Sequence, residues 1–246
     1  MQPYTASARI SQADIRRERY EKNKRNREFY DCIRDIVRHP AVLRMKKYAQ
    51  HCDTDCYEHC LNVAYQNFCI CQRLGLDARS AARGGMLHDL FLYDWRTHSR
   101  KTGDRLHAIT HPVAAYRNAR KYFHLNPVER EVIAKHMWPL SVFPPRYPET
   151  YVICLTDKYC GSMEILDHYS RKWKNRKLAA PLARAMERAV KKYPRIRQLQ
   201  EILPELDSMD SAAVRESFSR KRRHPSAGWS QGSGRRRGFG QGREKA

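Results

Sequence analysis

Residues 55–90, DCYEHCLNVAYQNFCICQRLGLDARSAARGGMLHDL, decide the fold class of this chain. Their apolar side chains recur at helical spacing on both sides of Gly75, which indicates two consecutive helices. Thr54 or Asp55 is expected to cap the first helix, because a short hydroxyl or carboxylate accepts the free amide hydrogens of a first turn. Gly75 then ends that helix, and Asp77 caps the next one.

Helical patterns continue on both sides of this stretch. Residues 11–38 predict a charged helix that Pro40 ends and whose few apolar contacts come from Ile15, Tyr20, Phe29, Ile33 and Ile36. Further helices are expected over 110–123, 127–137, about 149–166 and 178–193, with a polar loop at 98–107 and an irregular proline-rich loop from 139 to 148. We find no alternating run with hairpin turn signals, so the predicted class is all-α.

The charge of the chain is strongly positive. Its 246 residues include 48 Lys and Arg against 26 Asp and Glu, which gives a formal charge of +22. Such an excess favours anionic partners, namely nucleotides, nucleic acid or an acidic surface. Because the sequence contains no apolar run of ~20 residues and begins without an apolar signal core, we expect a cytoplasmic protein with no membrane partner. Its eight cysteines are then expected to be reduced.

The length suits one domain with extensions, which we predict as a charged helical extension over 1–40, a helical domain over 41–205 and a tail over 206–246. Residues 219–246 contain nine Lys or Arg and one Glu, and six of the eleven glycines lie at 228–242. Such a basic segment buries too little apolar surface to offset its ordering entropy, so it is expected to be disordered. It either stays solvated or contacts the phosphates of nucleic acid nonspecifically.

Residues of the metal-ligand type are spread through the helical middle of the chain. They are His59, His88, Asp89, His111, His136 and Asp157. Imidazole and carboxylate together suit iron, manganese, zinc, cobalt or nickel. The His88-Asp89 pair closes the apolar helix AARGGMLHDLF, and Asp157 interrupts the apolar stretch YVICLTDKYC. A buried charge without a partner is costly in such places, and a metal ion would remove that cost.

The order of these ligands, a histidine, a His-Asp pair, two more histidines and an aspartate, resembles the HD superfamily of metal-dependent phosphohydrolases. The segments that carry the resemblance are EHCLNVA, GGMLHDL, THPVAA, IAKHMWP and LTDKYC, within residues 52–166. It implies an HD-domain helical bundle that holds one or two divalent ions, with magnesium added to the metals above. His111 and His136 match the extra histidines of the branch that binds two metals.

The resemblance also implies a reaction, the hydrolysis of a phosphoester or phosphoanhydride in a phosphorylated small molecule that is nucleotide-like. Asp89 would bridge the metals, with His59, His88 and Asp157 on one side and His111 and His136 on the other. Lys158 is expected to contact phosphate, or else to be a helix-surface lysine. Asp94 is expected to orient a histidine or act as a general acid or base, or else to cap a helix. Weaker phosphate candidates are Arg83, Lys135 and Arg146.

Two other functions remain open. A cyclic-nucleotide or cyclic-dinucleotide phosphodiesterase would use the same metals, although the Gly-Tyr-Pro signature and early lysine of the cyclic-dinucleotide enzymes are missing here. A nucleic-acid-binding protein would use the helical domain only as a scaffold and bind through its tail. Among the remaining motifs, Cys52, Cys56 and Cys60 form either a second metal site or semi-buried thiols. Aromatic residues such as Trp95 either stack on a nucleobase or pack in the core.

Overall fold

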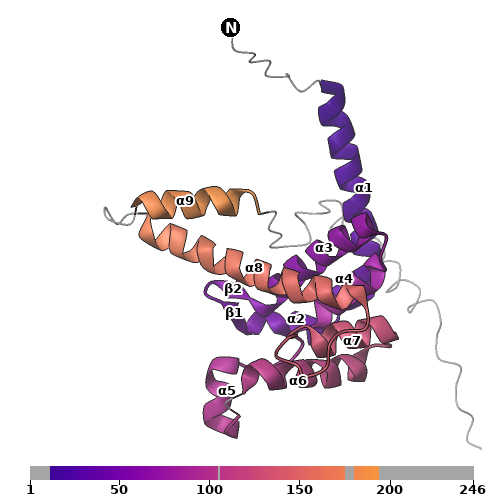
Figure 1. Cartoon of the computed structure of the whole chain (residues 1–246), viewed down its shortest axis with the longest axis vertical. Helices are drawn as coiled ribbons and strands as arrows, with labels where there is room; N and C mark the ends of the chain where they lie inside the picture. Colours follow the sequence, from indigo (N-terminus) through magenta and orange to yellow (C-terminus); the bar gives the residue numbers. More distant parts are fainter. Residues whose placement is uncertain (1–11, 105, 175–179, 194–246) are drawn as a thin grey trace, which may run out of the picture. The chain divides into compact units, whose positions relative to one another are not determined.

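The computed structural model describes residues 12–104, 106–174 and 180–193, and these confirm the predicted all-α class (Figure 1). The chain divides into two units, residues 1–204 and 205–246, and every described residue belongs to the first. In chain order the elements are α1 (Gln12–Val37), α2 (Pro40–Leu43), the 3-10 turn η1 (Arg44–Lys47), β1 (Ala49–His51), β2 (Thr54–Asp55), α3 (Cys56–Leu74), α4 (Ala78–Leu87), α5 (Trp95–Thr102), α6 (His107–Tyr122), α7 (Pro127–Lys135), α8 (Pro148–Trp173) and α9 (Ala180–Lys191).

The first unit is built around the packing of α3 against α4. α3 begins and ends as the sequence predicts: the Asp55 side chain accepts from the Glu58 amide at 2.8 Å, and the helix ends at Gly75, where φ is 68°. Asp77 caps α4 as predicted, but this helix ends at Leu87 and not at about Leu90. The two helices approach closely because α4 carries a glycine at the contact. A Cβ at Gly85 would lie 2.8 Å from the Cα of Ala64, too near for any larger residue. This contact sets α4, and with it the following His-Asp pair, directly against α3.

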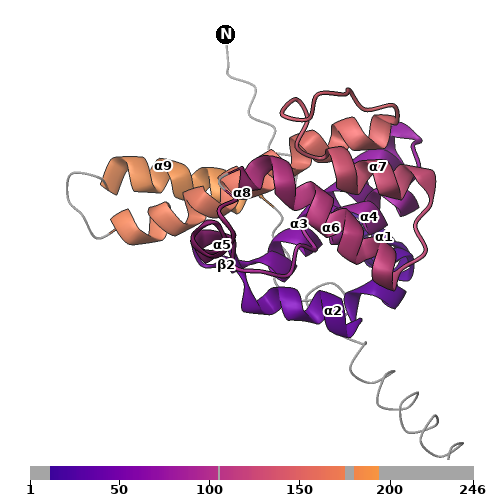
Figure 2. The ribbon, with the colours of Figure 1, turned by 90° about the horizontal axis from the view of Figure 1, so that it is seen from below.

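Three more helices complete the surroundings of that pair. α8 packs on α3, and α7 packs on both α4 and α6, which lie near it in Figure 2. α9 packs along the C-terminal part of α8 (Figure 1). A small apolar cluster that includes Val63, Val132 and Ile153 joins α3, α7 and α8.

The second half of α1 belongs to the core. Phe29, Ile33 and Ile36 are fully buried, as predicted, and α1 packs on α4. Ile15 and Tyr20 were also expected to pack, but they are 38% and 67% exposed, so this part of the prediction is wrong for the described chain. The first turns of α1 carry too few apolar residues to cover a neighbouring helix.

Local expectations fail in four further places. Residues 49–55 form a two-stranded antiparallel hairpin, β1–β2, although no strand was expected. Its strands have three and two residues, too short for an alternating pattern to show in a sequence. The segment expected as a polar loop at 98–107 is partly helical, because α5 runs to Thr102. The helix expected over 110–123 begins earlier, at His107, and α8 continues past Leu166 to Trp173.

Residues 206–246, with the basic tail, lie outside the described residues, so disorder and nucleic-acid contact stay predictions there. Within the part of the chain that the structure describes, all eight cysteines have free thiols. None of the described helices combines the length and the apolar character needed to cross a membrane.

Candidate metal centre

The six predicted ligand residues, far apart in the sequence, converge at one place in the fold. His59 comes from α3, His88 and Asp89 from the C-terminal end of α4, His111 from α6, His136 from the end of α7 and Asp157 from the middle of α8. All four histidines are buried, as is Asp89, while the Asp157 side chain is 14% exposed. The chain therefore gathers four imidazoles and two carboxylates from five helices.

The contacts divide the ligands into two parts that share Asp89. In the first part, which we call the His59 group (His59, His88 and Asp157), Asp157 Oδ1 lies 3.0 Å from His59 Nε2 and 3.6 Å from His88 Nε2. In the second part, the His111 pair (His111 and His136), the two Nε2 atoms lie 2.8 Å apart. Asp89 faces both parts: Oδ2 is 3.5 Å from His88 Nε2, and Oδ1 is 3.2 Å from His111 Nε2.

Each of the four histidines is held by its other ring nitrogen. The Nδ1 atoms lie within hydrogen-bond distance of an acceptor: Gly85 O at 2.8 Å for His88, His107 O at 2.7 Å for His111, Ile133 O at 2.9 Å for His136 and Glu164 Oε2 at 3.0 Å for His59. A carbonyl or carboxylate accepts only from a protonated Nδ1, so the Nε2 lone pair becomes the free ligand atom. Metal-binding histidines are held in this way in proteins generally.

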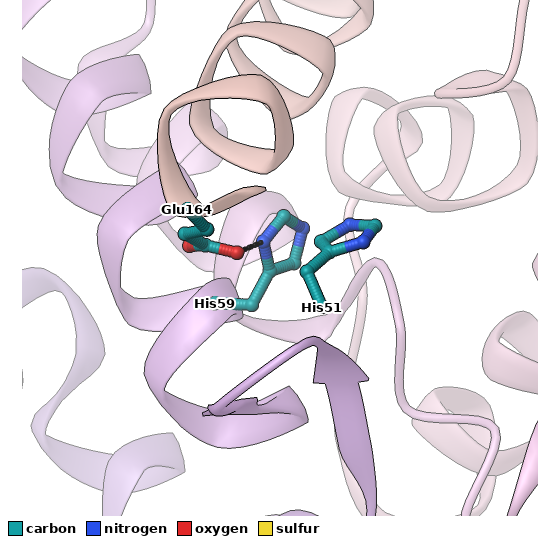
Figure 3. Close-up of side chains that lie close together, drawn as sticks. All are labelled: His51, His59 and Glu164. Atoms are coloured by element: carbon teal, nitrogen blue, oxygen red, sulfur yellow. Dashed lines mark hydrogen bonds and ion pairs between the residues drawn. The ribbon is translucent and has the colours of Figure 1, made fainter. Parts of the chain in front are cut away.

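His59 is the histidine of the four whose Nδ1 partner is a carboxylate. Figure 3 shows Glu164 of α8 and His51 of the hairpin on opposite sides of the His59 ring. Glu164 is buried, and its second oxygen, Oε1, has no hydrogen-bond partner among the described residues. The His51 ring packs edge-to-face on His59, with the centroids 5.2 Å apart. A Cβ at Gly161 would lie 2.9 Å from His51 Nε2, so this helical glycine leaves the room that the His51 ring needs.

The electrostatics of the two parts differ. Burial lowers the pKa of His59, but the charges of Glu164 and Asp157 outweigh it and hold that pKa well above the ordinary value. Burial likewise opposes the charged form of His88, yet Asp89 raises its pKa well above that value. The His111 pair is mixed: burial opposes the charged form of His111, but Asp89 raises its pKa. Burial and repulsion from His88 lower the pKa of His136 to about 3. Although burial opposes it, the nearby histidines hold the pKa of the Asp89 carboxyl well below its usual range.

The arrangement fits a divalent metal. The Nε2 atoms of His111 and His136 lie 2.8 Å apart, and each ring already donates its Nδ1 hydrogen to a backbone carbonyl. Two facing lone pairs repel each other, so a proton or a metal cation is needed to bind them. His88 Nε2 is buried with carboxylate oxygens at 3.5 and 3.6 Å and no hydrogen bond, although native proteins leave few such atoms unpaired. In two trios, His59–His88–Asp157 and His88–Asp89–His136, the ligand-type atoms lie within 4.8 Å of one another. Mixed nitrogen and oxygen donors of this kind suit the transition metals expected from the sequence.

A cavity of about 220 Å³ opens onto these ligands. Asp89, Asp157 and the His111 pair line its metal-binding side. The remaining lining residues are Gln50, His51, Trp95, His107, Ala108 and Met137. The Trp95 and His107 rings stack at 11° with centroids 5.6 Å apart, which gives the cavity a flat aromatic wall. The volume lies below the roughly 300 Å³ at which pockets begin to enclose a drug-sized ligand, so the cavity suits a phosphoryl group and part of what it is attached to.

Asp94 and Lys158, the other two predicted catalytic residues, are not among the described residues that line this cavity. Asp94 is exposed and accepts from the Arg96 amide at 3.0 Å at the start of α5, which is the capping arrangement. Lys158 is exposed, and its Nζ donates to the Cys154 carbonyl on its own helix at 3.0 Å. Their catalytic roles therefore stay predictions.

The weaker phosphate candidates also lie elsewhere. Arg83 is buried in ion pairs with Asp35 at 2.6 Å and Glu129 at 2.7 Å, where it joins α4 to α1 and α7. Lys135 and Arg146 line a different cavity of about 770 Å³. The cysteine site is not supported either: α3 begins only at Cys56, and the potential metal groups among the described residues contain no cysteine.

Sequence reasoning missed several residues at the centre. Gln50 and His51 belong to the unexpected hairpin. His107 lies in the 98–107 segment, which the sequence assigned to a polar loop and to one wall of the pocket without a ligand, and it does line the cavity. Glu164 was unremarked in the helix expected over about 149–166, which continues to Trp173 as α8. A buried glutamate seven residues after Asp157, two helical turns along the same face, was a usable signal for an interaction with another ligand.

The family model described as HD domain matches residues 56–161, a range that contains all six ligand residues. No curated protein and no solved structure matches the chain significantly.

Proposed function

Because residues 56–161 form an HD domain, which indicates a metal-dependent phosphohydrolase in general, we propose that this protein hydrolyses a phosphoester or phosphoanhydride of a nucleotide-like substrate. The observation that carries the proposal is the orientation of the four buried histidines. Each has its Nδ1 held by an acceptor, and their Nε2 atoms converge on two carboxylates.

The contacts among these residues suggest which of them would hold each metal. The His59 group and Asp89 would hold one divalent metal, and the His111 pair and Asp89 a second. When bound, such metals lower the pKa of a water molecule toward neutrality and stabilise the attacking and leaving oxygens. Asp89 suits the shared position because its two oxygens face different parts of the ligand set. Lys158 and Asp94 remain proposed catalytic residues, and Lys158→Ala and Asp94→Ala test them through kcat.

The aromatic wall supports a substrate that carries a ring. Trp95 and His107 line the same cavity as Asp89 and Asp157, so a phosphate beside the carboxylates would place its attached group near the indole. Stacking of a base on an aromatic side chain contributes roughly 1–3 kcal/mol. The excess of Lys and Arg, +22 over the chain, favours the approach of an anionic substrate.

The test compares matched phosphates with metal-loaded protein. Nucleoside mono-, di- and cyclic phosphates and dinucleoside phosphates are assayed beside ribose 5-phosphate, which has the sugar phosphate but no base. We expect chelation to abolish turnover, and kcat/KM for the preferred nucleotide to exceed that for ribose 5-phosphate at least about 10-fold. Trp95→Ala should reduce this preference, whereas Trp173→Ala, which removes an indole packed on Tyr169 outside this cavity, should not.

The outcomes separate the two parts of the proposal. Metal-loaded protein that hydrolyses none of these phosphates would overturn the phosphohydrolase assignment. Equal turnover of ribose 5-phosphate and the nucleotides, unchanged by Trp95→Ala, would remove the nucleotide part and leave the general assignment standing. Turnover of cyclic phosphates alone would favour the phosphodiesterase alternative.

A further inference from the structure

Gln50 makes the shortest contact to the shared carboxylate. It lies in β1, before the HD match begins at residue 56, and its side chain lines the cavity beside the ligands. Its Nε2 donates to Asp89 Oδ2 at 2.5 Å. A hydrogen bond to an ionised carboxylate is stronger than one between neutral groups and fixes the carboxylate in one orientation. Gln50 therefore orients Asp89, the carboxylate that faces both the His59 group and the His111 pair.

The other end of the Gln50 amide has no partner. Oε1 is buried and lacks a hydrogen bond to any described residue. Buried polar atoms in native proteins almost always have a partner, either from the protein or from a bound water or ligand. A carbonyl oxygen accepts hydrogen bonds or coordinates a cation, so the missing partner is an O–H or N–H donor or a cation. Gln50 lines the cavity that contains Asp89 and Asp157, so a molecule bound there would be the nearest candidate partner.

The backbone around Gln50 is held from outside the hairpin. The Arg96 guanidinium of α5 donates to the Ala49 carbonyl at 2.8 Å and to the Gln50 carbonyl at 3.4 Å. At the hairpin turn, Asp53 pairs with His168 of α8 at 2.9 Å. The amide is therefore presented to the cavity from a fixed backbone, as a positioning group requires.

We propose that Gln50 is a positioning residue of this centre: its amide N–H orients the Asp89 carboxylate, and its amide carbonyl accepts a hydrogen bond from a water or hydroxyl bound in the cavity. This inference rests on the proposed function, in which Asp89 is the ligand that both metals share. The competing role for Gln50 is structural, a polar side chain that packs the hairpin onto the end of α4.

Gln72 provides a matched control. It is an exposed glutamine of α3 whose Nε2 donates to Glu28 Oε2 at 2.9 Å, outside the cavity. Gln50→Met and Gln72→Met make the same chemical change, the loss of an amide that donates to a carboxylate, at two different places. The full chain is stripped of metal and titrated with Mn²⁺ by calorimetry. The melting temperature of the metal-free protein, kcat and KM for the preferred phosphate are measured on the same samples.

We expect Gln50→Met to raise the Kd for Mn²⁺ about 10-fold, as the loss of groups that hold metal ligands typically does. It should also lower kcat, whereas Gln72→Met should match the wild type. Gln50→Glu keeps an acceptor but loses the donor; here kcat should fall although the added charge preserves Mn²⁺ affinity. If Gln50→Met does not fold, Gln50→Glu decides the matter.

Two results would overturn the inference. One is a Gln50→Met protein with wild-type Kd and kcat and only a lowered melting temperature, the result of a structural role. The other is wild-type kcat in Gln50→Glu. Failure of the proposed function looks different, because the wild type itself would then bind no Mn²⁺ or turn over no phosphate.

Discussion

The His59 group and the His111 pair are two halves of one ligand set with unequal surroundings. Around His59 and His88 stand three carboxylates, Asp89, Asp157 and Glu164, which hold the pKa values of both imidazoles well above the ordinary value. The His111 pair has Asp89 as its ion-pairing carboxylate among the described residues. Despite burial, Asp89 raises the pKa of His111, but the pKa of His136 falls to about 3. One half thus stabilises positive charge strongly, while burial dominates at His136.

This difference has a consequence for metal binding. A divalent cation interacts with the same negative charges that raise the pKa of an imidazole, so the more anionic half should bind metal more tightly. Neutral histidines of the His111 pair still provide lone pairs for a metal. The negative charge at that half would come from the shared Asp89. The ligands are of the same chemical type in both halves, and their surroundings make the halves unequal.

The largest expected effect comes from the residue that the halves share. Asp89→Asn keeps the size of the side chain but removes the charge that faces both His88 and His111. We expect the loss of both metals at ordinary metal concentrations and a fall in kcat/KM of about 10³-fold, since metal catalysis contributes several kcal/mol. Metal analysis of the purified variant checks this. A variant that retains two equivalents would contradict the shared role of Asp89.

Changes in the His111 pair should remove one metal only. In His136→Ala, bound metal should drop from about two equivalents to about one, and turnover should fall steeply because two metals no longer act together. If His136 were only a core residue, the variant would keep its metal and lose on the order of 1–3 kcal/mol of stability. His59→Ala, on the other half, should remove the tighter metal. Metal stoichiometry and melting temperature on both variants distinguish these outcomes.

Glu164→Gln sharpens the comparison without touching a ligand. The amide oxygen can still accept from His59 Nδ1, so the change removes mainly a buried negative charge 3.0 Å from the ring. We expect metal affinity to fall about 10-fold at the His59 group and to remain unchanged at the His111 pair. Two-site titration of the metal-free protein measures both constants. An equal loss at both halves would show that Glu164 acts on the whole fold.

The smallest effect is the pH dependence of the metal-free protein. The pKa of His136 is lowered to about 3 by burial, so the folded state binds fewer protons than the unfolded state between that pH and about 6.5. Stability should therefore fall as pH drops through this window. His59 and His88 have raised pKa values, so their contribution is complete below about pH 6.5 and is lost as pH rises through the folded pKa.

Melting curves of chelator-treated protein across these pH values should thus show a maximum near pH 6.5, with changes of about a few degrees on each side. His136→Gln should flatten the acid side, and His59→Gln the alkaline side. A profile that neither variant changes would mean that other groups govern the pH dependence.

Much of this molecule could be predicted from local sequence. The helix boundaries at Asp55, Gly75 and Asp77 depend on capping and on one left-handed backbone position, and both are local properties. His88, Asp89 and Asp157 were recognisable as ligand candidates because they interrupt apolar helices, where a charge needs a partner. His59, His111 and His136 were added by the resemblance to the HD superfamily. The tiny hairpin and α5 were missed because neither is long enough for a periodic pattern.

The sequence by itself predicted which side chains form the candidate metal centre, since residue types and their order along helices are written in it. Only the tertiary structure decided how these side chains divide. The pairing of His59 with Glu164 spans 105 residues, and that of Gln50 with Asp89 spans 39. Such contacts arise when α3, α4 and α8 pack, and no local pattern encodes the distance between two helices. For this reason the inequality of the two halves, and the place of Gln50 beside the shared carboxylate, follow from packing alone.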